Sequence, residues 1–174
     1  MKLTQQWYAL LTRSRFENVV HDKIHQKSIH VFLPKIKVKS QRKDRNKMLH
    51  VPLFPGYVFV NISPTPREQL MVLKTMGAVR LLGYKDGPVP IPDDHIESLK
   101  IITGSGLDII TGPGAGLAKG DPVLVVNGPM TGATGEFIQY KGKGRVIIKI
   151  EALGQFAGVE IDEADIEKTP HMMP

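Results

Sequence analysis

The sequence predicts an α+β protein in two parts: an N-terminal α/β sandwich, with a mixed sheet and flanking helices, and a small C-terminal SH3-like β-barrel. Two observations predict this division. Segments with strand and helix spacing interleave up to about residue 103, whereas from Asp121 onward short strands are separated by glycine-rich turns. Residues 104–120 contain six glycines, which is typical of a flexible linker. We therefore expect domains at 1–103 and 118–170, joined by a linker at 104–117.

The first part is expected to begin with a strand and a helix. Trp7–Leu11 is a short apolar run with aromatics at its start, as in a buried strand. Ser14 and Glu17 have the spacing of a capping box, with Ser14 as the N-cap. The helix that follows is expected to run to about Lys27, because apolar residues recur at helical spacing at positions 16, 19, 20 and 24.

A basic hairpin is predicted next. Residues 35–39 alternate lysine with Ile36 and Val38, so a strand would place three lysines on one face. Residues 42–47 are polar and basic, as expected of the hairpin tip. After two prolines the chain enters a strand over Tyr57–Val60.

Two more helices are indicated by their first residues. Thr65 and Glu68 form a second capping-box pattern, with Pro66 at the first helical position. A third helix is expected to begin after Pro92, since Asp93 and Asp94 would favour its N-terminal turn. In the second part, four strands are expected at 122–126, 136–140, 145–151 and 156–161. The run 146–150 is rich in β-branched residues, which favours a β-barrel for the second part over a helical conformation of the same residues.

Composition narrows the functional class. The net charge is +6, divided as +9 over residues 1–60 and −3 over residues 61–174. A basic first segment favours a polyanionic or acidic partner, although an unevenly charged solvated surface is the alternative. There is no cysteine, which excludes disulfides, thiolate metal sites and a cysteine nucleophile. No apolar run is long enough for a membrane helix, so we expect a cytoplasmic protein with no membrane contact.

We find no constellation of residues that indicates an enzyme. Glu17, His21 and His25 fall on one face of the first helix and could hold a divalent metal. A solvated polar face is the favoured interpretation, because no further ligand is placed by the sequence. The serines lack the surroundings of a nucleophile. We therefore expect no catalysis, no metal and no cofactor.

Aromatic residues cluster in one segment. Tyr57 and Phe59 would share a face of their strand, and Phe54 could reach that surface across the Pro-Gly turn. Together with Tyr8 or Leu11 they could form an apolar depression for a partner helix. On pattern alone, a simple core role is favoured for the cluster.

Four motifs follow one another along the chain: Trp7-Tyr8, the block Val51–Val60 (VPLFPGYVFV), the run from Gly120 to Gly135 (GDPVLVVNGPMTGATG) and Val159–Asp162. In these motifs the chain resembles the NusG family of transcription elongation factors. The resemblance implies an NGN domain over residues 1–103, a KOW domain over 118–170, and a monomer. It also implies that the NGN domain binds the clamp helices of the largest RNA polymerase subunit, near the non-template DNA strand, and suppresses pausing.

The resemblance assigns candidate residues to each role. The RNA polymerase-binding residues would be Leu11, Phe54, Tyr57 and Phe59, in place of a core-only role. Those near nucleic acid would be Arg13, Arg15, Lys23, Gln26 and Lys27, to which the basic hairpin adds Arg42, Lys43 and Arg45. For any single cation, a solvated side chain is the equal alternative.

The C-terminal domain is expected to recruit a partner through Met130 and Phe137. Met130 and Ala133 stand where housekeeping members carry aromatics, which argues against activation of the Rho factor and leaves a ribosomal small-subunit protein open. The compact segment from Ile29 to Gly56, the block Val51–Val60 and the run Gly87–Pro92 (GPVPIP) resemble the specialised paralogues of the family, so we favour an RfaH-like antiterminator. The alternatives are a housekeeping factor that acts with Rho in termination and a ribosome-associated KOW module.

Overall fold

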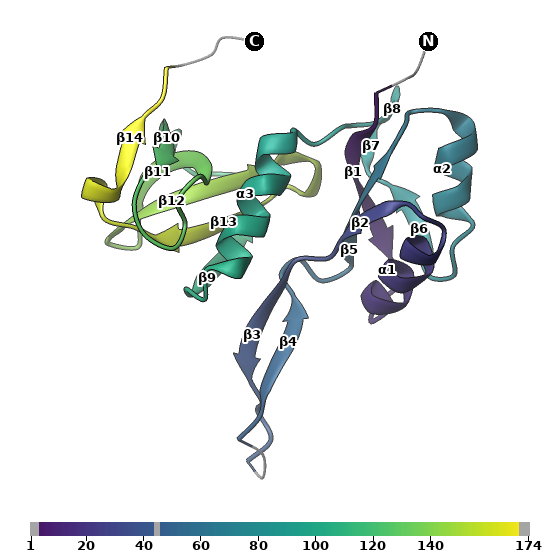
Figure 1. Cartoon of the computed structure of the whole chain (residues 1–174), viewed down its shortest axis with the longest axis horizontal. Coiled ribbons are helices and arrows are strands. Elements are labelled where there is room, and N and C mark those ends of the chain that lie inside the picture. The colour runs from purple at the N-terminus through teal and green to yellow at the C-terminus, as the bar shows by residue number, and fades with distance from the viewer. Residues whose placement is uncertain (1–3, 44–45, 171–174) are drawn as a thin grey trace. The chain divides into compact units, whose positions relative to one another are not determined.

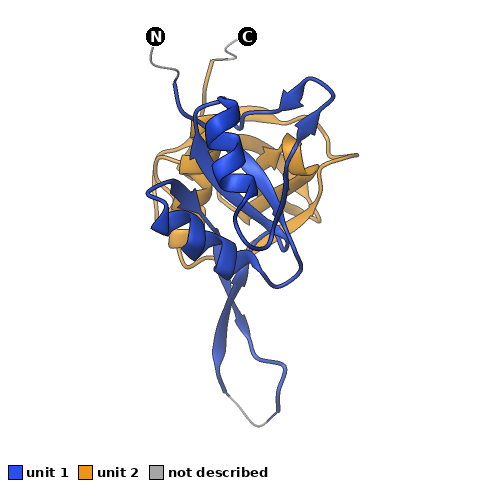
Figure 2. Cartoon of the chain, turned by 90° about the vertical axis from the view of Figure 1, so that its right-hand side faces the viewer, with its two compact units in different colours: residues 1–91 blue, residues 92–174 orange. Residues whose placement is uncertain are grey.

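The computed structural model describes residues 4–43 and 46–170, and the chain divides into two compact units (Figure 2). Unit 1 extends to Ile91 and unit 2 begins at Pro92. Unit 1 contains 16 Lys and Arg against 5 Asp and Glu, a net charge of +11, whereas unit 2 contains 7 against 12, a net charge of −5. The charge asymmetry expected from the sequence therefore coincides with the structural division.

Unit 1 is built on a four-stranded sheet in the order β2-β5-β1-β6. Its strands are β1 (Gln6–Thr12), β2 (His30–Phe32), β5 (Tyr57–Ile62) and β6 (Ala78–Leu81). The predicted mixed pairing is wrong, because every pair in this sheet is antiparallel. Strands β1 and β2 do run in the same direction, but β5 lies between them, so they never pair directly.

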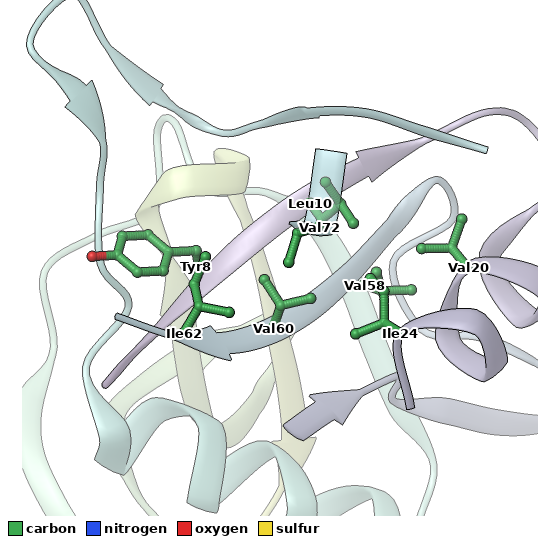
Figure 3. Close-up of a cluster of buried hydrophobic side chains, with 8 residues drawn as sticks. All are labelled: Tyr8, Leu10, Val20, Ile24, Val58, Val60, Ile62 and Val72. Carbon is green, nitrogen blue, oxygen red and sulfur yellow. The ribbon is translucent and has the colours of Figure 1, made fainter. Parts of the chain in front are cut away.

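Two helices cover one face of this sheet. They are α1 (Glu17–Gln26) and α2 (Pro66–Leu73). Val20 and Ile24 of α1 and Val72 of α2 pack against apolar side chains from β1 and β5 (Figure 3). The strand residues of this core are Tyr8, Leu10, Val58, Val60 and Ile62. Burial of these side chains is the main term that holds the helices to the sheet.

The two predicted capping boxes have different outcomes. At α2 the N-cap is confirmed, because Thr65 Oγ1 accepts from the Glu68 N–H, whereas Glu68 Oε2 accepts from the Ser63 N–H and not from that of Thr65. At α1 it is wrong: Phe16 is the N-cap residue, with no side-chain cap bond. The reason is that Arg15 takes a left-handed conformation, with φ of 65°, and Glu17 is used elsewhere.

A two-stranded hairpin extends from unit 1. It consists of β3 (Lys35–Lys39) and β4 (Met48–Pro52), and both views show it projecting beyond the sheet (Figures 1 and 2). A second, shorter hairpin joins β7 (Gly83–Tyr84) to β8 (Gly87–Pro88). The predicted basic hairpin is therefore confirmed as an element, and its central pairs are Ile36 with Val51 and Lys37 with His50.

Unit 2 is a six-stranded antiparallel sheet in the order β14-β10-β11-β12-β13-β9. Four of its strands match the prediction: β10 (Asp121–Val125), β11 (Thr134–Tyr140), β12 (Lys143–Ile150) and β13 (Gln155–Glu160). A 3₁₀ turn (Glu151–Leu153) joins β12 to β13, and another (Glu163–Asp165) precedes β14 (Ile166–Lys168). The run 146–150 is strand, as its β-branched residues predicted.

Two features of unit 2 differ from the expected boundaries. The helix α3 (Asp93–Gly104), which the sequence suggested as the end of the first domain, belongs to unit 2. Within the expected flexible linker, β9 (Ile109–Pro113) pairs with β13. Ile110 packs against the cluster of Ile138, Ile147 and Phe156, so the burial of apolar surface offsets the conformational entropy that the nearby glycines lose on folding.

Among the helices of the described residues, none has the length and apolar character that a membrane span requires.

Candidate functional site

The sheet of unit 1 has a second face, turned away from α1 and α2. Side chains alternate between the two faces along a strand, and directly paired residues share a face. Leu11 pairs with Tyr57, and Ala9 pairs with Phe59. Their neighbours Leu10 and Val58 belong to the helix-covered core. Leu11, Tyr57 and Phe59 therefore lie on the face opposite the helices.

Phe54 joins this face through a tight turn. The Tyr57 N–H donates to the Phe54 carbonyl across Pro55-Gly56, and Gly56 has φ of +89°. The positive φ at the third position of the turn favours glycine there, and proline is common at the second position, as the sequence provides. The Phe54 and Phe59 rings meet edge to face, with centroids 6.4 Å apart, and Phe59 also stacks on Phe32. The structure thus brings the four predicted docking residues together.

The four residues differ in their exposure. Leu11 and Tyr57 are half-buried. Phe54 is 1% exposed and Phe59 is 0% exposed. In this structure, the side chains that a partner can reach are therefore Leu11 and Tyr57, and the two phenylalanine rings act as packed support.

Glu17 holds the turn in place. Glu17 is 7% exposed as a residue, and its Oε1 accepts the Gly56 N–H at 2.9 Å. On the other side, the Thr12 N–H donates to the Gly56 carbonyl at 2.8 Å. The N–H of Gly56 is thereby held by α1 and its carbonyl by β1. Sequence analysis missed this role because Glu17 and Gly56 lie 39 positions apart.

Basic and amide side chains at and before α1 form the second candidate surface, the one predicted to lie near nucleic acid. Arg13 and Arg15 are exposed in the turn before α1, and Lys23 and Gln26 are exposed on the helix. Lys27 is placed differently: its Nζ donates to the Met71 carbonyl and to Thr75 Oγ1, at 2.8 and 3.0 Å. Lys27 therefore ties α1 to the end of α2 and has fewer donors left for a phosphate.

The tip of the β3–β4 hairpin carries the other predicted cations. Arg42 and Lys43 are exposed there, and Arg45 lies outside the described residues. Along β3, Lys37 and Lys39 are also exposed, whereas Lys35 donates to Asn18 Oδ1 of α1. The structure thus separates the predicted nucleic-acid residues into two groups, one beside α1 and one on the projecting hairpin (Figure 1).

The metal candidates of α1 are engaged in other contacts. The rings of His21 and His25 stack with centroids 6.2 Å apart. His21 Nδ1 lies 3.0 Å from Asp22 Oδ1, and Glu17 binds Gly56. Within residues 4–43 and 46–170, no three His, Asp or Glu side chains are placed to hold a metal ion.

One ionisable group of unit 1 is perturbed by burial. Desolvation raises the pKa of the Tyr8 hydroxyl, which donates to Gln6 Oε1 at 3.1 Å. Burial therefore favours the neutral phenol of Tyr8 over the charged phenolate.

The two candidate residues of unit 2 lie in different surroundings. Met130 is 3% exposed, and β11, which follows the loop that carries it, is hydrogen-bonded to α3 at its first residue. Ser98 Oγ of α3 accepts the Thr134 N–H at 2.9 Å and lies 3.2 Å from Thr134 Oγ1. Phe137 is half-buried and lines an open hollow. Of these two residues, only Phe137 is reachable by a partner in this structure.

Comparisons with known proteins agree with this architecture. The family model described as "Transcription termination factor nusG" matches residues 5–100. The transcription termination/antitermination protein NusG of Bacillus subtilis (strain 168) is 26% identical over 178 aligned positions, covering 95% of this chain and 99% of the relative. The protein of the same name from Streptococcus pyogenes serotype M1 is 23% identical over 168 positions, covering 90% and 92%. The solved structure titled "Domain interaction in Thermotoga maritima NusG" superimposes with a TM-score of 0.53 at 21% identity, covering 95% of this chain and 98% of that one.

Proposed function

This chain belongs to the NusG family, and from that premise we propose that it is a transcription elongation and antitermination factor. Unit 1 binds the clamp helices of the largest RNA polymerase subunit through the sheet face that carries Leu11 and Tyr57. The bound factor suppresses pausing and promotes read-through, while unit 2 recruits a further partner. The curated relatives named above are termination/antitermination proteins.

The observation that supports polymerase docking is the strand register. One face of the sheet is covered by α1 and α2, and the other face gathers the four residues that the family resemblance assigns to docking. An apolar helix pair of a partner is recognised by such a face through side-chain packing. Phe54 and Phe59 give the face its shape, and Leu11 and Tyr57 supply the contact.

The basic residues support contact with the non-template strand. Arg13, Arg15 and Lys23 are exposed around α1, and unit 1 carries a net charge of +11. Phosphate contacts of this kind release counterions, so their contribution falls steeply with salt. Arg42 and Lys43 would add contacts from the hairpin.

The choice of a specialised antiterminator over a housekeeping factor rests on the loop of unit 2. Met130 and Ala133 are both buried against the rest of the chain. Neither offers the exposed aromatic surface expected of a Rho-binding loop. We therefore propose that the factor acts without Rho, with a ribosomal small-subunit protein as the candidate partner. Rho-dependent termination is the competing function.

A single-round transcription assay tests the proposal. The template carries a pause site and a Rho-dependent terminator, and the cognate polymerase is used with and without Rho. We expect the wild-type chain to increase read-through, and the double variant Leu11→Ala/Tyr57→Ala to lose both this effect and polymerase binding. The matched control is Val79→Ala, which removes an exposed apolar side chain from β6 of the same sheet. We choose Leu11 and Tyr57 over Phe54 because replacing a fully buried ring would also destabilise unit 1 by about 3–5 kcal/mol.

Each outcome decides between the functions. Read-through that persists in the double variant would refute docking through this face. More termination only when Rho is present would identify a housekeeping factor instead.

A further inference from the structure

Unit 2 contains an open hollow of about 1040 Å³. It is bounded by the start of β9, by the hairpin between β11 and β12, and by the segment that follows β13. All its lining residues belong to unit 2. It lies apart from the loop of Met130, which does not line it.

The hollow has an apolar wall centred on an aromatic ring. Phe137 of β11 lines it together with Val159 of β13 and Ile161. Gly144 of β12 makes room for the ring, because a Cβ at that position would lie 2.7 Å from Phe137 Cζ. The Ile161 N–H donates to the Gly144 carbonyl at 3.0 Å, which ties the segment after β13 to β12. The aromatic wall is thus built by the fold.

Acidic groups dominate the rim. Four carboxylates line the hollow, those of Asp108, Glu160, Asp162 and Glu163, against the two cations Lys143 and Arg145. Both cations are already engaged: Lys143 Nζ lies 3.1 Å from Glu160 Oε2, and Arg145 Nε donates to the Tyr140 carbonyl at 3.2 Å.

Three carboxylates of the rim are left without a cation. In the described part of the chain, no ion pair is formed by Asp108, Asp162 or Glu163. The rim therefore has a surplus of negative charge that its own cations do not neutralise. The net charge of −5 on unit 2 has the same sign.

We propose that this hollow binds a basic, extended segment of a partner protein. An arginine or lysine of that segment lays its aliphatic stem along Phe137 and places its charged head between Asp162 and Glu163. An aromatic face beside carboxylates is a favourable environment for such a cation, through cation–π attraction and charge pairing. The negative rim repels nucleic-acid phosphates, which favours a protein partner. This inference deepens the partner-recruiting role proposed above for unit 2.

The test uses the full chain and a defined probe. The probe is a fluorescein-labelled, glycine-rich peptide that carries Leu-Arg pairs, and its control peptide has glutamine in place of each arginine. We measure binding by fluorescence anisotropy at low salt, and we map it on the ¹⁵N-labelled chain by NMR. We expect saturable binding of the arginine peptide, with the largest shift changes at Leu107, Phe137 and Ile161.

A matched pair of variants separates a built site from bulk charge. Asp162→Asn/Glu163→Gln removes two rim carboxylates, and Glu151→Gln/Glu167→Gln removes two exposed carboxylates of unit 2 that do not line the hollow. Both doubles change the net charge equally. We expect the first to raise the Kd about tenfold and the second to leave it nearly unchanged. An equal loss in both variants, or binding of the glutamine peptide with the same Kd, would overturn the proposal.

Polymerase binding provides an independent reading. The rim variants are expected to bind polymerase like the wild type, because they leave unit 1 intact. If the rim variants lose peptide binding but still bind polymerase, the peptide site lies in unit 2. If Leu11→Ala/Tyr57→Ala still binds polymerase, the proposed docking face is wrong, but the proposal for the hollow is not affected.

Discussion

Replacing Glu17 should destabilise unit 1 by removing the bond that anchors the docking turn. Glu17 is a buried residue, and its carboxylate accepts the Gly56 N–H at 2.9 Å. A hydrogen bond to a charged group contributes about 1.5–3 kcal/mol, and its loss leaves the donor unsatisfied. Glu17 also lies in the first turn of α1, where a negative charge contributes about 0.3–1 kcal/mol.

Two replacements separate these terms. Glu17→Ala removes the acceptor and the charge, so we expect a loss of about 2–3 kcal/mol in the free energy of unfolding, after a small gain from the helix propensity of alanine. Glu17→Gln keeps an oxygen acceptor and loses only the charge, so we expect about 1 kcal/mol. The control is Asp22→Asn, an exposed acid on the same helix, which should change stability by less than about 0.5 kcal/mol.

Urea unfolding followed by tryptophan fluorescence measures this effect. Trp7 is the only tryptophan of the chain and lies in β1, so its signal reports on unit 1. We expect the alanine variant to bind polymerase more weakly even where unit 1 is folded, because the Phe54–Tyr57 turn is released. An alanine variant with the unfolding midpoint of the wild type would show that the turn does not depend on Glu17.

Three further outcomes follow from other contacts. Ser98→Ala should loosen the start of β11, next to the loop of Met130, by removing the bonds of Thr134 to α3. Hydrogen exchange at the Thr134 amide and at the neighbouring loop amides should then become about tenfold faster; unchanged exchange would show that α3 does not hold this end of the loop. Lys27→Met should lower the melting temperature of unit 1 by several degrees, since its bonds to α2 are lost, whereas Lys23→Met should not; equal melting temperatures would contradict the bridging role. Because burial raises the pKa of Tyr8 above its usual value near 10, the folded state holds a proton that the unfolded state loses, so stability should fall as pH rises above about 10. Tyr8→Phe should flatten that decline in a pH series of urea midpoints, and an equally steep decline would assign it to other groups.

Much of the fold could be predicted from local sequence patterns. The alternation at Lys35–Lys39 predicted a strand with its lysines on one face, and β3 has that form. Thr65 and Glu68 predicted the start of α2 to the residue. In each case the deciding interactions lie within a few positions along the chain, which is why a local pattern suffices.

The rest depended on long-range contacts. Ser14 and Glu17 satisfied the capping pattern, yet Glu17 bonds to Gly56, and the helix begins without a side-chain cap. Strand β9 forms inside a glycine-rich stretch because β13 offers an open edge to pair with. Its stability comes from a partner strand distant in sequence, which composition does not reveal.

Residue type predicted which side chains gather on this face of the sheet, but it did not predict which of them are exposed. The register brings Leu11 and Tyr57 together as expected, whereas Phe54 and Phe59 are packed away from solvent. Aromatic clustering indicates an apolar surface, but it does not tell which rings form its supporting layer. The same holds for charged residues. The sequence shows that Lys27 is a cation, but not that its ammonium group donates hydrogen bonds to the end of α2.

The position of α3 changes what can act as a joint in this chain. The Ile91 N–H donates to the Trp7 carbonyl, which ends unit 1, and α3 of unit 2 begins at Asp93. Between these anchors stands Pro92, whose ring fixes its φ torsion. Apart from Gly104, which ends α3, the glycine-rich stretch follows α3 along the chain and lies within unit 2. Residues inserted before Pro92 would therefore lengthen the connection between the units, whereas residues inserted into the glycine-rich stretch would lengthen a segment within unit 2.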